Sequence, residues 1–297
     1  MQSNLIPSIE HSARELEIKL KSYRETIDRM IAKKAKQLGG EGKLQEACEY
    51  ALLNGGKRFR PALVFMVAEA LGRGLDVTNQ ALAIEYFHTA SLIADDLPCM
   101  DDDDERRNKP TTHKVYGESV ALLASYALIA AGYGAIGAVS AESAVKGITA
   151  DVIVMALENA AFNTGLQGAT GGQFLDIFPP DLNENTLRDI IQKKTGTLFE
   201  ISFVFGWLFG GGDPKKLYKV KNCASHFGMA FQVADDLGDV EQDAQNGRKV
   251  NMAGVFGVER ARNILRDEIA GYRSLLSELG IASPELLGLA ASLEVSV

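Results

Sequence analysis

The sequence predicts an all-α fold: a single domain, residues 1–297, built from roughly ten antiparallel helices with apolar central members. Three observations carry this prediction. Helical patterns cover most of the chain, and alternating strand patterns joined by Asn-Gly turns are absent. The segments between helices are short, so no linker divides the chain. With 297 residues, the chain is long enough to bury a sizeable core.

The first predicted helices lead to a cluster of aspartates. Residues 8–36 are charged and amphipathic, which predicts a long surface helix. Pro61 is typical of a first helical turn, and Gly72 ends the helix that it opens. Residues 76–94 then predict a long helix that points directly at the aspartates.

The middle of the chain is apolar. Residues 118–163 predict two mostly apolar helices, and the run VALLASYALIAAGYGAIGAV, residues 120–139, is long enough to cross a membrane. Because this run is rich in Ala, Gly and Tyr and lies between polar segments, we expect a buried central helix and no membrane span.

Three further helical segments complete the fold. Residues 184–209 and 214–240 each predict one helix. Residues 259–279 predict another, which Gly280 ends.

Composition limits the partners and the compartment. The formal net charge of -8 argues against sequence-independent nucleic-acid binding, although a local basic pocket or bound metals would still admit an anionic substrate. Cys48, Cys99 and Cys223 show neither a disulfide framework nor zinc-ligand spacing. The first twenty residues lack the pattern of a secretory signal, so we expect a cytoplasmic location.

The stretch LIADDLPCMDDDDERR, residues 92–107, crowds like charges at the end of an apolar helix. Asp95 and Asp96 precede Asp101, and Pro98 bends the chain between them. We expect that bend to bring Asp101 back towards Asp95. A solvated acidic helix end is the alternative interpretation.

A second cluster has the same character. The stretch FGMAFQVADDLGD, residues 227–239, again ends an apolar helical run in aspartates. Asp235 and Asp239 are four residues apart and share one helix face, with Asp236 beside them. Mg²⁺ prefers oxygen ligands and often combines one or two carboxylates with substrate phosphates. The two clusters together therefore predict a magnesium site for a phosphorylated substrate.

Basic residues that suit a phosphate accompany the acids. They occur next to glycines or directly after the first acidic cluster, and Arg offers a bidentate fork to phosphate oxygens. The set is Lys57, Arg58 and Arg60 in GGKRFRP, Arg106 and Arg107, and Lys194 and Thr195 in KKTGTLF. For any one of them, a surface cation is the alternative.

These motifs occur in a familiar order. GGKRFRP, HTASLIADDLPCMDDDDERRNKPTTHKVYGE, GGQFLD, KKTGTLF and FQVADDLGD follow one another over residues 40–265. In this order the chain resembles the trans-polyprenyl diphosphate synthases, and among them the short-chain farnesyl or geranylgeranyl diphosphate synthases. The resemblance implies antiparallel helices around a deep central cavity, and usually a homodimer.

The resemblance also implies roles for individual residues. Both aspartate motifs would hold Mg²⁺, about three ions with substrate bound, through Asp95, Asp96, Asp101, Asp235 and Asp239, with Asp236 and Lys194 also catalytic. The allylic diphosphate would be bound by Arg106, Lys194, Thr195, Gln173 and Gln232, and Asp176 would support the reacting groups. Isopentenyl diphosphate would be bound by Lys57, Arg60, His88 and Arg107.

The implied reaction joins isopentenyl diphosphate to an allylic diphosphate: dimethylallyl, geranyl or farnesyl. The carbon–oxygen bond of the allylic substrate ionises, the double bond of isopentenyl diphosphate attacks the cation, and a proton is lost. No protein nucleophile is needed, which fits the absence of a Ser/His/Asp or Cys/His set.

Product length depends on the helix before Asp95, which lines the tunnel in this family. Ala90 and Ser91 are small and leave the tunnel open, with Ala90 ~7.5 Å along the helix from Asp95. We expect Phe87, Tyr86 or a neighbouring helix to form the floor. This arrangement favours geranylgeranyl over farnesyl diphosphate.

Some positions depart from the family pattern. Ala94 replaces a frequent His, and Ser125-Tyr126 replaces a usual Gly-Asp. The loop at residues 241–251 is short, so Arg248 or Lys249 would have to replace the usual lysine on the allylic diphosphate. Two alternative functions stay open: a class I terpene cyclase, and a non-catalytic regulatory subunit of a heteromeric prenyl synthase.

Overall fold

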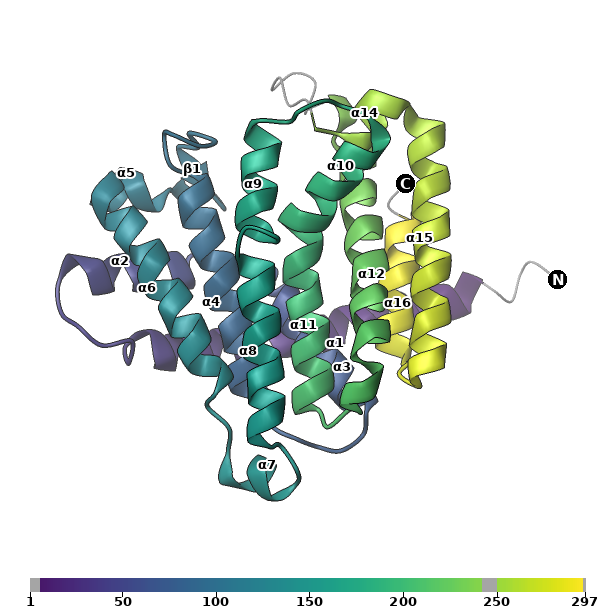
Figure 1. The fold of residues 1–297 in the computed structure, drawn as a ribbon, viewed down its shortest axis with the longest axis horizontal. Helices are drawn as coiled ribbons and strands as arrows, with labels where there is room; N and C mark the ends of the chain where they lie inside the picture. The colour runs from purple at the N-terminus through teal and green to yellow at the C-terminus, as the bar shows by residue number, and fades with distance from the viewer. Residues whose placement is uncertain (1–5, 242–249, 296–297) are drawn as a thin grey trace.

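Long apolar and amphipathic segments fold into helices throughout the part of the chain that the structure describes. A computed structural model describes residues 6–241 and 250–295, and within them the fold is all-α, as predicted (Figure 1). The helices are α1 (Ile6–Ala35), α2 (Lys43–Leu53), α3 (Phe59–Ala70), α4 (Thr78–Asp95), α5 (Thr112–Tyr116), α6 (Glu118–Ile136), α7 (Ala141–Val145), α8 (Ala150–Thr164), α9 (Ala169–Ile177), α10 (Glu184–Ile191), the π-helix η1 (Gln192–Gly196), α11 (Thr197–Phe209), the 3₁₀-helix η2 (Pro214–Lys216), α12 (Leu217–Gly238), α14 (Met252–Phe256), α15 (Val258–Leu279) and α16 (Pro284–Val295).

The only strands in the described residues form one short hairpin. β1 (Glu105–Arg106) pairs antiparallel with β2 (Lys109–Pro110), and Arg107 and Asn108 between them both have positive φ angles. The hairpin directly follows the first acidic cluster and carries its two arginines.

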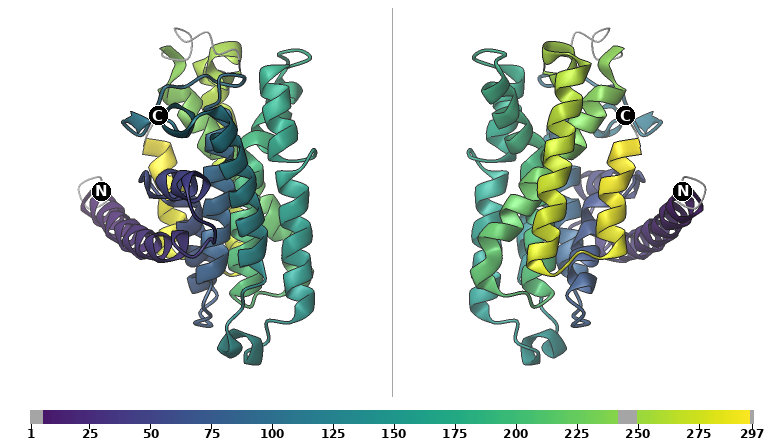
Figure 2. Two further views of the ribbon diagram at one scale, coloured as in Figure 1. Left: turned by 90° about the vertical axis from the view of Figure 1, so that its left-hand side faces the viewer. Right: turned by 90° about the vertical axis from the view of Figure 1, so that its right-hand side faces the viewer.

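α11 lies at the centre of the core. Every residue of α11 except Glu200 is buried, because its sequence is apolar on all sides and it packs against α3, α8 and α12. α4 packs along α6, and α12 packs along α15. α1 crosses the other helices and extends beyond them (Figure 2).

The prediction that residues 120–139 form a buried central helix was wrong for most of that helix. α6 is the one helix in the described residues that is long and apolar enough to cross a membrane, with a mean hydropathy of 1.7. Only 33% of it is buried. Its α4 side lies in the core, whereas Leu122, Leu123 and Tyr126 are exposed. The sequence shows no polar face on α6, so it gave no sign that one side would remain uncovered.

α4 and α12 carry the two acidic clusters to the same end of the bundle. Both helices run towards the upper end in Figure 1, where α10, α14 and the β1–β2 hairpin also lie. The middle of each helix is largely apolar and buried, and the aspartates follow at the end that reaches the top of the bundle.

Candidate active site

The first acidic cluster ends α4 and folds back on itself. Asp95 is the last residue of α4, and the backbone N–H of Asp96 donates to the carbonyl of Leu92. After the turn at Pro98, the N–H of Asp101 donates to the carbonyl of Asp95 at 2.9 Å. This bond holds Asp101 beside Asp95, which is the arrangement expected from the bend.

The second acidic cluster lies across a cavity from the first. Asp235, Asp236 and Asp239, at the end of α12, line a cavity of about 480 Å³. Asp101 lines the same cavity, which we call the head cavity. The fold therefore brings two carboxylate clusters that are distant in sequence to one polar space.

Polar side chains from α9, η1 and α12 complete the head cavity. The ammonium of Lys194 forms an ion pair with Asp176. Thr195 Oγ1 donates to Gln232 Oε1 at 2.9 Å, and Gln232 Nε2 donates to Asp236 Oδ1 at 2.9 Å. Cations and hydroxyl donors thus face the carboxylates, as a site for a polyanion with bound cations requires.

The π-helix presents Lys194 and Thr195 to the cavity. α10, η1 and α11 follow one another without a break, and a π-turn inside an α-helix is frequent at functional sites. Gly172 of α9 allows a very close approach here, because a Cβ at this position would overlap the backbone of Lys194. The sequence predicted one regular helix over residues 184–209 and did not reveal this π-turn.

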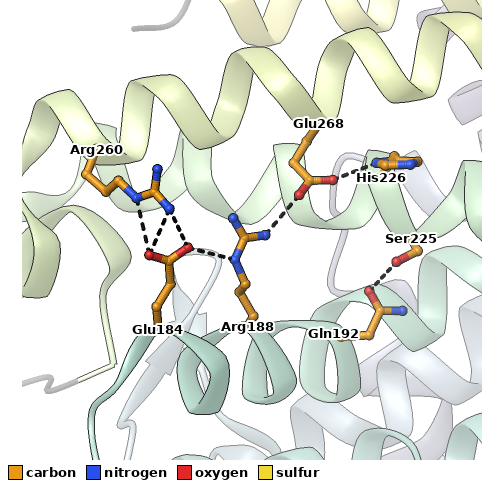
Figure 3. A network of polar contacts seen from close by, with 7 residues as sticks. All are labelled: Glu184, Arg188, Gln192, Ser225, His226, Arg260 and Glu268. Carbon is orange, nitrogen blue, oxygen red and sulfur yellow. Dashed lines mark hydrogen bonds and ion pairs between the residues drawn. The ribbon is translucent and has the colours of Figure 1, made fainter.

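A polar network fastens α10 and η1 to α12 and α15 (Figure 3). Arg188 donates to Glu184 on its own helix and to Glu268 of α15, and Glu268 also contacts His226 of α12 at 2.7 Å. At the start of η1, Gln192 accepts a hydrogen bond of 2.8 Å from Ser225. These bonds hold the π-helix and the helix before it against α12 and α15.

The electrostatics at Asp95 favour a bound cation. Burial raises the pKa of the Asp95 carboxyl to about 7, with Lys194 opposing the rise and Asp101 adding to it. A carboxyl that is buried beside other acids is stabilised in its charged form by a nearby positive charge. The surroundings of Asp95 therefore fit a cation site.

Oxygen donors dominate the site, as Mg²⁺ requires. Within residues 6–241 and 250–295, no three His, Cys, Asp or Glu side chains are grouped closely enough to hold a metal ion. Ions here would need oxygens from a bound ligand as well, which is the usual mode for Mg²⁺. The residues present thus fit magnesium that arrives with a phosphorylated substrate.

Two of the predicted aspartates already have protein partners. Arg106 donates from two nitrogens to Asp96 Oδ1 and also contacts Asp103 at 2.8 Å. Asp236 Oδ2 accepts from the backbone N–H of Met252 at 2.7 Å. Asp96 and Asp236 are both buried, so each anchors a loop at the rim of the site in addition to any contact with a ligand.

An apolar cavity of about 400 Å³ adjoins the head cavity, and we call it the tail cavity. Lys194 and Ile177 line both spaces. From α4 the tail cavity is lined by Phe87, Ala90 and Ser91, together with Asp95 at its polar end. Tyr86 is buried but is not among the residues that line the cavity.

Gln173 lines the tail cavity with both of its polar atoms unsatisfied. Its Oε1 and Nε2 are buried and have no hydrogen-bond partner. A buried amide without partners costs free energy, so such a group points to a ligand that it contacts. Asp176, one helical turn further along α9, faces the head cavity instead.

A basic pocket lies on the α3 side of α4. Arg60 Nη1 lies 3.3 Å from His88 Nε2, and the Arg60 guanidinium stacks over Phe199 at 4.8 Å from the ring centre. Arg60 Nε and His88 Nδ1 are buried without partners. Arg107 reaches this region from the β1–β2 turn by donating to the carbonyl of Gly55. Lys57 is exposed beside it.

The charges of this pocket are shifted by burial. Burial lowers the pKa of Arg60 to about 10, with Glu85 opposing the change. Burial, followed by the positive charges of Arg60 and Arg107, lowers the pKa of His88 well below its ordinary range. A neutral imidazole beside crowded guanidinium groups fits a pocket that receives an anion.

Arg58 does not belong to the anion pocket, which corrects the expectation from the GGKRFRP motif. Its guanidinium is buried and donates to Asp28, Glu85 and the carbonyl of Leu52. Arg58 therefore joins α1, α2 and α4 as a structural residue. Arg248 and Lys249, the proposed substitutes for a loop lysine, lie outside the described residues.

Sequence reasoning missed the apolar residues that α9 contributes to the tail cavity. Phe174, Ile177 and Phe178 line this cavity, and Phe174 and Phe178 are also largely exposed. The available signal was that Ile177 and Phe178 lie three and four residues after Phe174, because residues at this spacing share one helix face.

Comparison with known proteins identifies the kind of protein that this chain resembles. The family model described as Polyprenyl synthetase matches residues 41–253. The chain is 37% identical over 254 residues to "Geranylgeranyl pyrophosphate synthase 4" of Arabidopsis thaliana, covering 78% of this chain and 66% of that one. It is 35% identical to a farnesyl diphosphate synthase of Geobacillus stearothermophilus, covering 88% of this chain and 84% of that one.

Solved structures give the same picture. The apo structure of an FPP/GFPP synthase from Zymomonas mobilis superposes with a TM-score of 0.80 at 30% identity, covering 94% of this chain and 99% of that one. A geranyltransferase from Legionella pneumophila superposes with a TM-score of 0.82 at 25% identity, covering 96% and 98%. The helical fold is thus shared with these enzymes.

Proposed function

Since the chain belongs to the polyprenyl synthetase family, we propose that it is a magnesium-dependent trans-prenyltransferase that makes short-chain prenyl diphosphates. The observation that carries this proposal is the pair of adjoining cavities. A polar cavity is lined by Asp101, from the loop after α4, and by the aspartates at the end of α12. It shares Lys194 with an apolar cavity whose polar end is formed by Asp95 of α4. An allylic diphosphate, with a polyanionic head and a hydrocarbon tail, matches that division.

The head cavity would bind the diphosphate of the allylic substrate. We propose Asp95, Asp96, Asp101, Asp235 and Asp239 as magnesium ligands, and Lys194, Thr195, Gln232 and Arg106 as direct contacts of the diphosphate. When bound, Mg²⁺ supplies positive charge that stabilises the departing diphosphate. Asp236 positions Gln232 by accepting its hydrogen bond.

The basic pocket would hold isopentenyl diphosphate through Lys57, Arg60, His88 and Arg107. Arg60 Nε and His88 Nδ1 are the unsatisfied atoms that this second diphosphate would contact. Because the pocket and the tail cavity lie on neighbouring faces of α4, the double bond of isopentenyl diphosphate would meet the allylic carbon near Gln173 and Asp95.

The reaction then needs separation of charge in a dry space. The allylic carbon–oxygen bond breaks, and both electrons leave with the diphosphate that Lys194 and Thr195 hold. The π electrons of isopentenyl diphosphate form the new carbon–carbon bond, and the resulting cation loses a proton to the released diphosphate. The apolar lining of the tail cavity excludes water, which would otherwise capture the cation.

The favoured product is geranylgeranyl rather than farnesyl diphosphate. Ala90 and Ser91 are small and line the tail cavity, so α4 does not close it near Asp95. Phe87 lines the cavity one turn further from the metal site and would form its floor from the α4 side.

A product analysis tests the proposed function directly. Purified protein would be incubated with Mg²⁺, isopentenyl diphosphate and either dimethylallyl, geranyl or farnesyl diphosphate. We expect all-trans diphosphates that are one or more isoprene units longer than the starter. Cyclic hydrocarbons would instead identify a terpene cyclase, and absence of turnover from every starter would identify a non-catalytic subunit.

We also propose that the chain forms one domain and acts as a homodimer through α6 and α8. These neighbouring helices expose Leu122, Leu123, Tyr126, Val154, Met155 and Phe162. Monomers rarely expose contiguous apolar patches of this kind. We propose no nucleic-acid partner, in line with the net charge of -8.

We propose that the protein works in a reducing compartment, with the cytoplasm as the first expectation. The three cysteines are free, and two of them are buried. Because a relative from Catharanthus roseus is named as chloroplastic, membership of the family does not by itself fix the compartment.

A further inference from the structure

A hydrogen bond between two helices borders the tail cavity at Thr164. Tyr133 Oη, on α6, lies 2.5 Å from Thr164 Oγ1, at the end of α8. Thr164 lines the tail cavity, and so does Phe87 from α4. The Tyr133 and Phe87 rings meet edge to face, with centres 5.1 Å apart. Tyr133 of α6 therefore contacts Phe87 of α4 on one side and Thr164 of α8 on the other.

The depth of this contact follows from the helix directions. From Asp95, the cavity-lining residues of α4 run down the helix to Phe87, which is ~12 Å away. α6 runs in the opposite direction: Ser125 donates to the carbonyl of Ala90, and Ile129 lines the cavity one turn below. Tyr133 is the next residue in that series, so it lies below both of them.

The direction of the Tyr133–Thr164 bond is determined by a third group. Thr164 Oγ1 also lies 2.8 Å from the carbonyl of Ala160, to which only the threonine can donate. A hydroxyl carries one proton, so the threonine oxygen must accept from Tyr133. Both hydroxyls are thereby satisfied beside the apolar cavity that Thr164 lines.

Phe87 is held against the same contact. A Cβ at Gly132, next to Tyr133, would lie 2.6 Å from the Phe87 ring, so the ring occupies space that only glycine leaves open. Phe87 is also 3% exposed. The ring therefore cannot swing towards α6 to let a longer chain pass.

We propose that Tyr133 and Thr164 form a hydrogen-bonded bar that, together with Phe87, closes the tail cavity and limits the length of the prenyl product. The proposal rests on the proposed function and assigns the limit to α6 and α8 as well as to α4. A chain that grows past the bar must separate the two hydroxyls. Thr164 keeps its bond to the carbonyl of Ala160, but the Tyr133 hydroxyl loses its acceptor, which is unfavourable.

Product distributions of variants test the bar. Tyr133→Ala removes it, and we expect the main product to lengthen by at least one isoprene unit. Tyr133→Phe and Thr164→Val keep the shape but remove the bond, so the ratio of the next longer product to the main product should rise about fivefold. Tyr218→Ala, an exposed tyrosine outside both cavities, is the matched control and should leave the distribution unchanged.

A binding experiment separates the bar from the reaction itself. Unreactive thiolo-diphosphate analogues with tails of increasing length would be titrated into the wild-type protein and the same variants. We expect affinity to fall at a certain tail length in wild type and to persist to a longer tail in Tyr133→Ala. Should all variants, folded by circular dichroism, keep both the wild-type products and the wild-type length cut-off, the bar has no role. If the wild-type protein elongates no starter, the proposed function is refuted. The binding series would then still show whether the Tyr133–Thr164 bar limits the length of the tail that the cavity accepts.

Discussion

At the scale of single residues, the site depends on carboxylates whose charge is costly until a cation arrives. Burial raises the pKa of Asp95 to about 7, and Asp101 adds to the rise from the opposite side of a tight turn. Asp235 supplies the facing charge across the head cavity. In the proposed function the aspartates stabilise the metal-bound state, whereas in the free protein burial disfavours the charged form of Asp95.

Replacing either facing aspartate should abolish most activity without unfolding the protein. For Asp95→Ala and Asp235→Ala we expect kcat/KM to fall by about a hundredfold to a thousandfold, because charge stabilisation of the leaving group is lost. Asp104→Ala is the control: this residue belongs to the same acidic stretch but lies exposed beside Lys114. Near-normal rates in both aspartate variants would contradict the metal assignment.

Gln173 offers a test in which stability and activity change in opposite directions. Both polar atoms of Gln173 are buried without partners, so Gln173→Leu removes an unfavourable group from the free protein. We expect an unchanged or higher melting temperature together with a turnover at least tenfold lower. A stabilised variant with full activity would show that the amide does not contact the substrate.

A substitution at Ala90 tests whether α4 helps to set the length of the product. Ala90 is 1% exposed and lines the tail cavity, so a tyrosine at this position would fill the space below Asp95. We expect Ala90→Tyr to shorten the main product from twenty to fifteen carbons or fewer. Chain-length analysis decides: a wild type that stops at fifteen carbons and a variant that does the same would refute the expectation.

At the scale of elements, the π-helix is the feature that the fold must hold in place. η1 presents Lys194 and Thr195, while Arg188, Glu268 and His226 connect the preceding helix to α12 and α15 (Figure 3). Burial alone would raise the pKa of Glu268, but hydrogen bonds from His226 and Arg188 outweigh it and lower that pKa below its ordinary value. The network is therefore stable only with Glu268 ionised.

This network should make the free energy of unfolding depend on pH in the acidic range. Because the folded-state pKa of Glu268 is lowered, its contribution is complete above its unfolded pKa of about 4.3 and is lost as pH falls through the lower folded value. At pH 7 we expect Glu268→Gln to reduce the free energy of unfolding by about 2 kcal/mol. Denaturant titrations should show that difference shrinking below about pH 4.

Glu278→Gln provides the matched control on the same helix. Glu278 pairs with Lys219 at the surface, where its side chain is 48% exposed, so its loss should cost less than about 1 kcal/mol. If Glu268→Gln and Glu278→Gln reduce the free energy of unfolding equally at pH 7, the network stabilises the protein no more than a surface ion pair does.

At the scale of the whole molecule, the exposed apolar face of α6 and α8 predicts self-association. Leu123→Glu together with Phe162→Glu places charges at the centre of this face, because both side chains are more than half exposed. We expect wild type at the mass of a dimer and the double variant at that of a monomer by light scattering. Ile18→Glu on α1, also exposed, should leave the mass unchanged, and a monomeric wild type would overturn the prediction.

Most of the fold and the chemistry could be predicted because the relevant signals are local. Pro61 lies in the first turn of α3, and Gly280 directly follows α15, as expected from the conformations that these two residue types favour. The bend at Pro98 returns Asp101 to Asp95. What could not be predicted depends on packing between distant segments. At the π-turn, Gly172 of α9 lies directly against the backbone of Lys194. Arg58 is structural because Asp28 and Glu85, from two other helices, accept its hydrogen bonds. The Tyr133–Thr164 bond likewise joins two separate helices.

The most direct test of the central claim is a crystal structure with Mg²⁺ and an unreactive thiolo analogue of an allylic diphosphate. We predict metal ions that bridge the diphosphate to Asp95 and Asp101 on one side and to Asp235 and Asp239 on the other, with the prenyl tail under Ala90. Ions held by one aspartate cluster alone, or a diphosphate bound away from Lys194, would contradict the account.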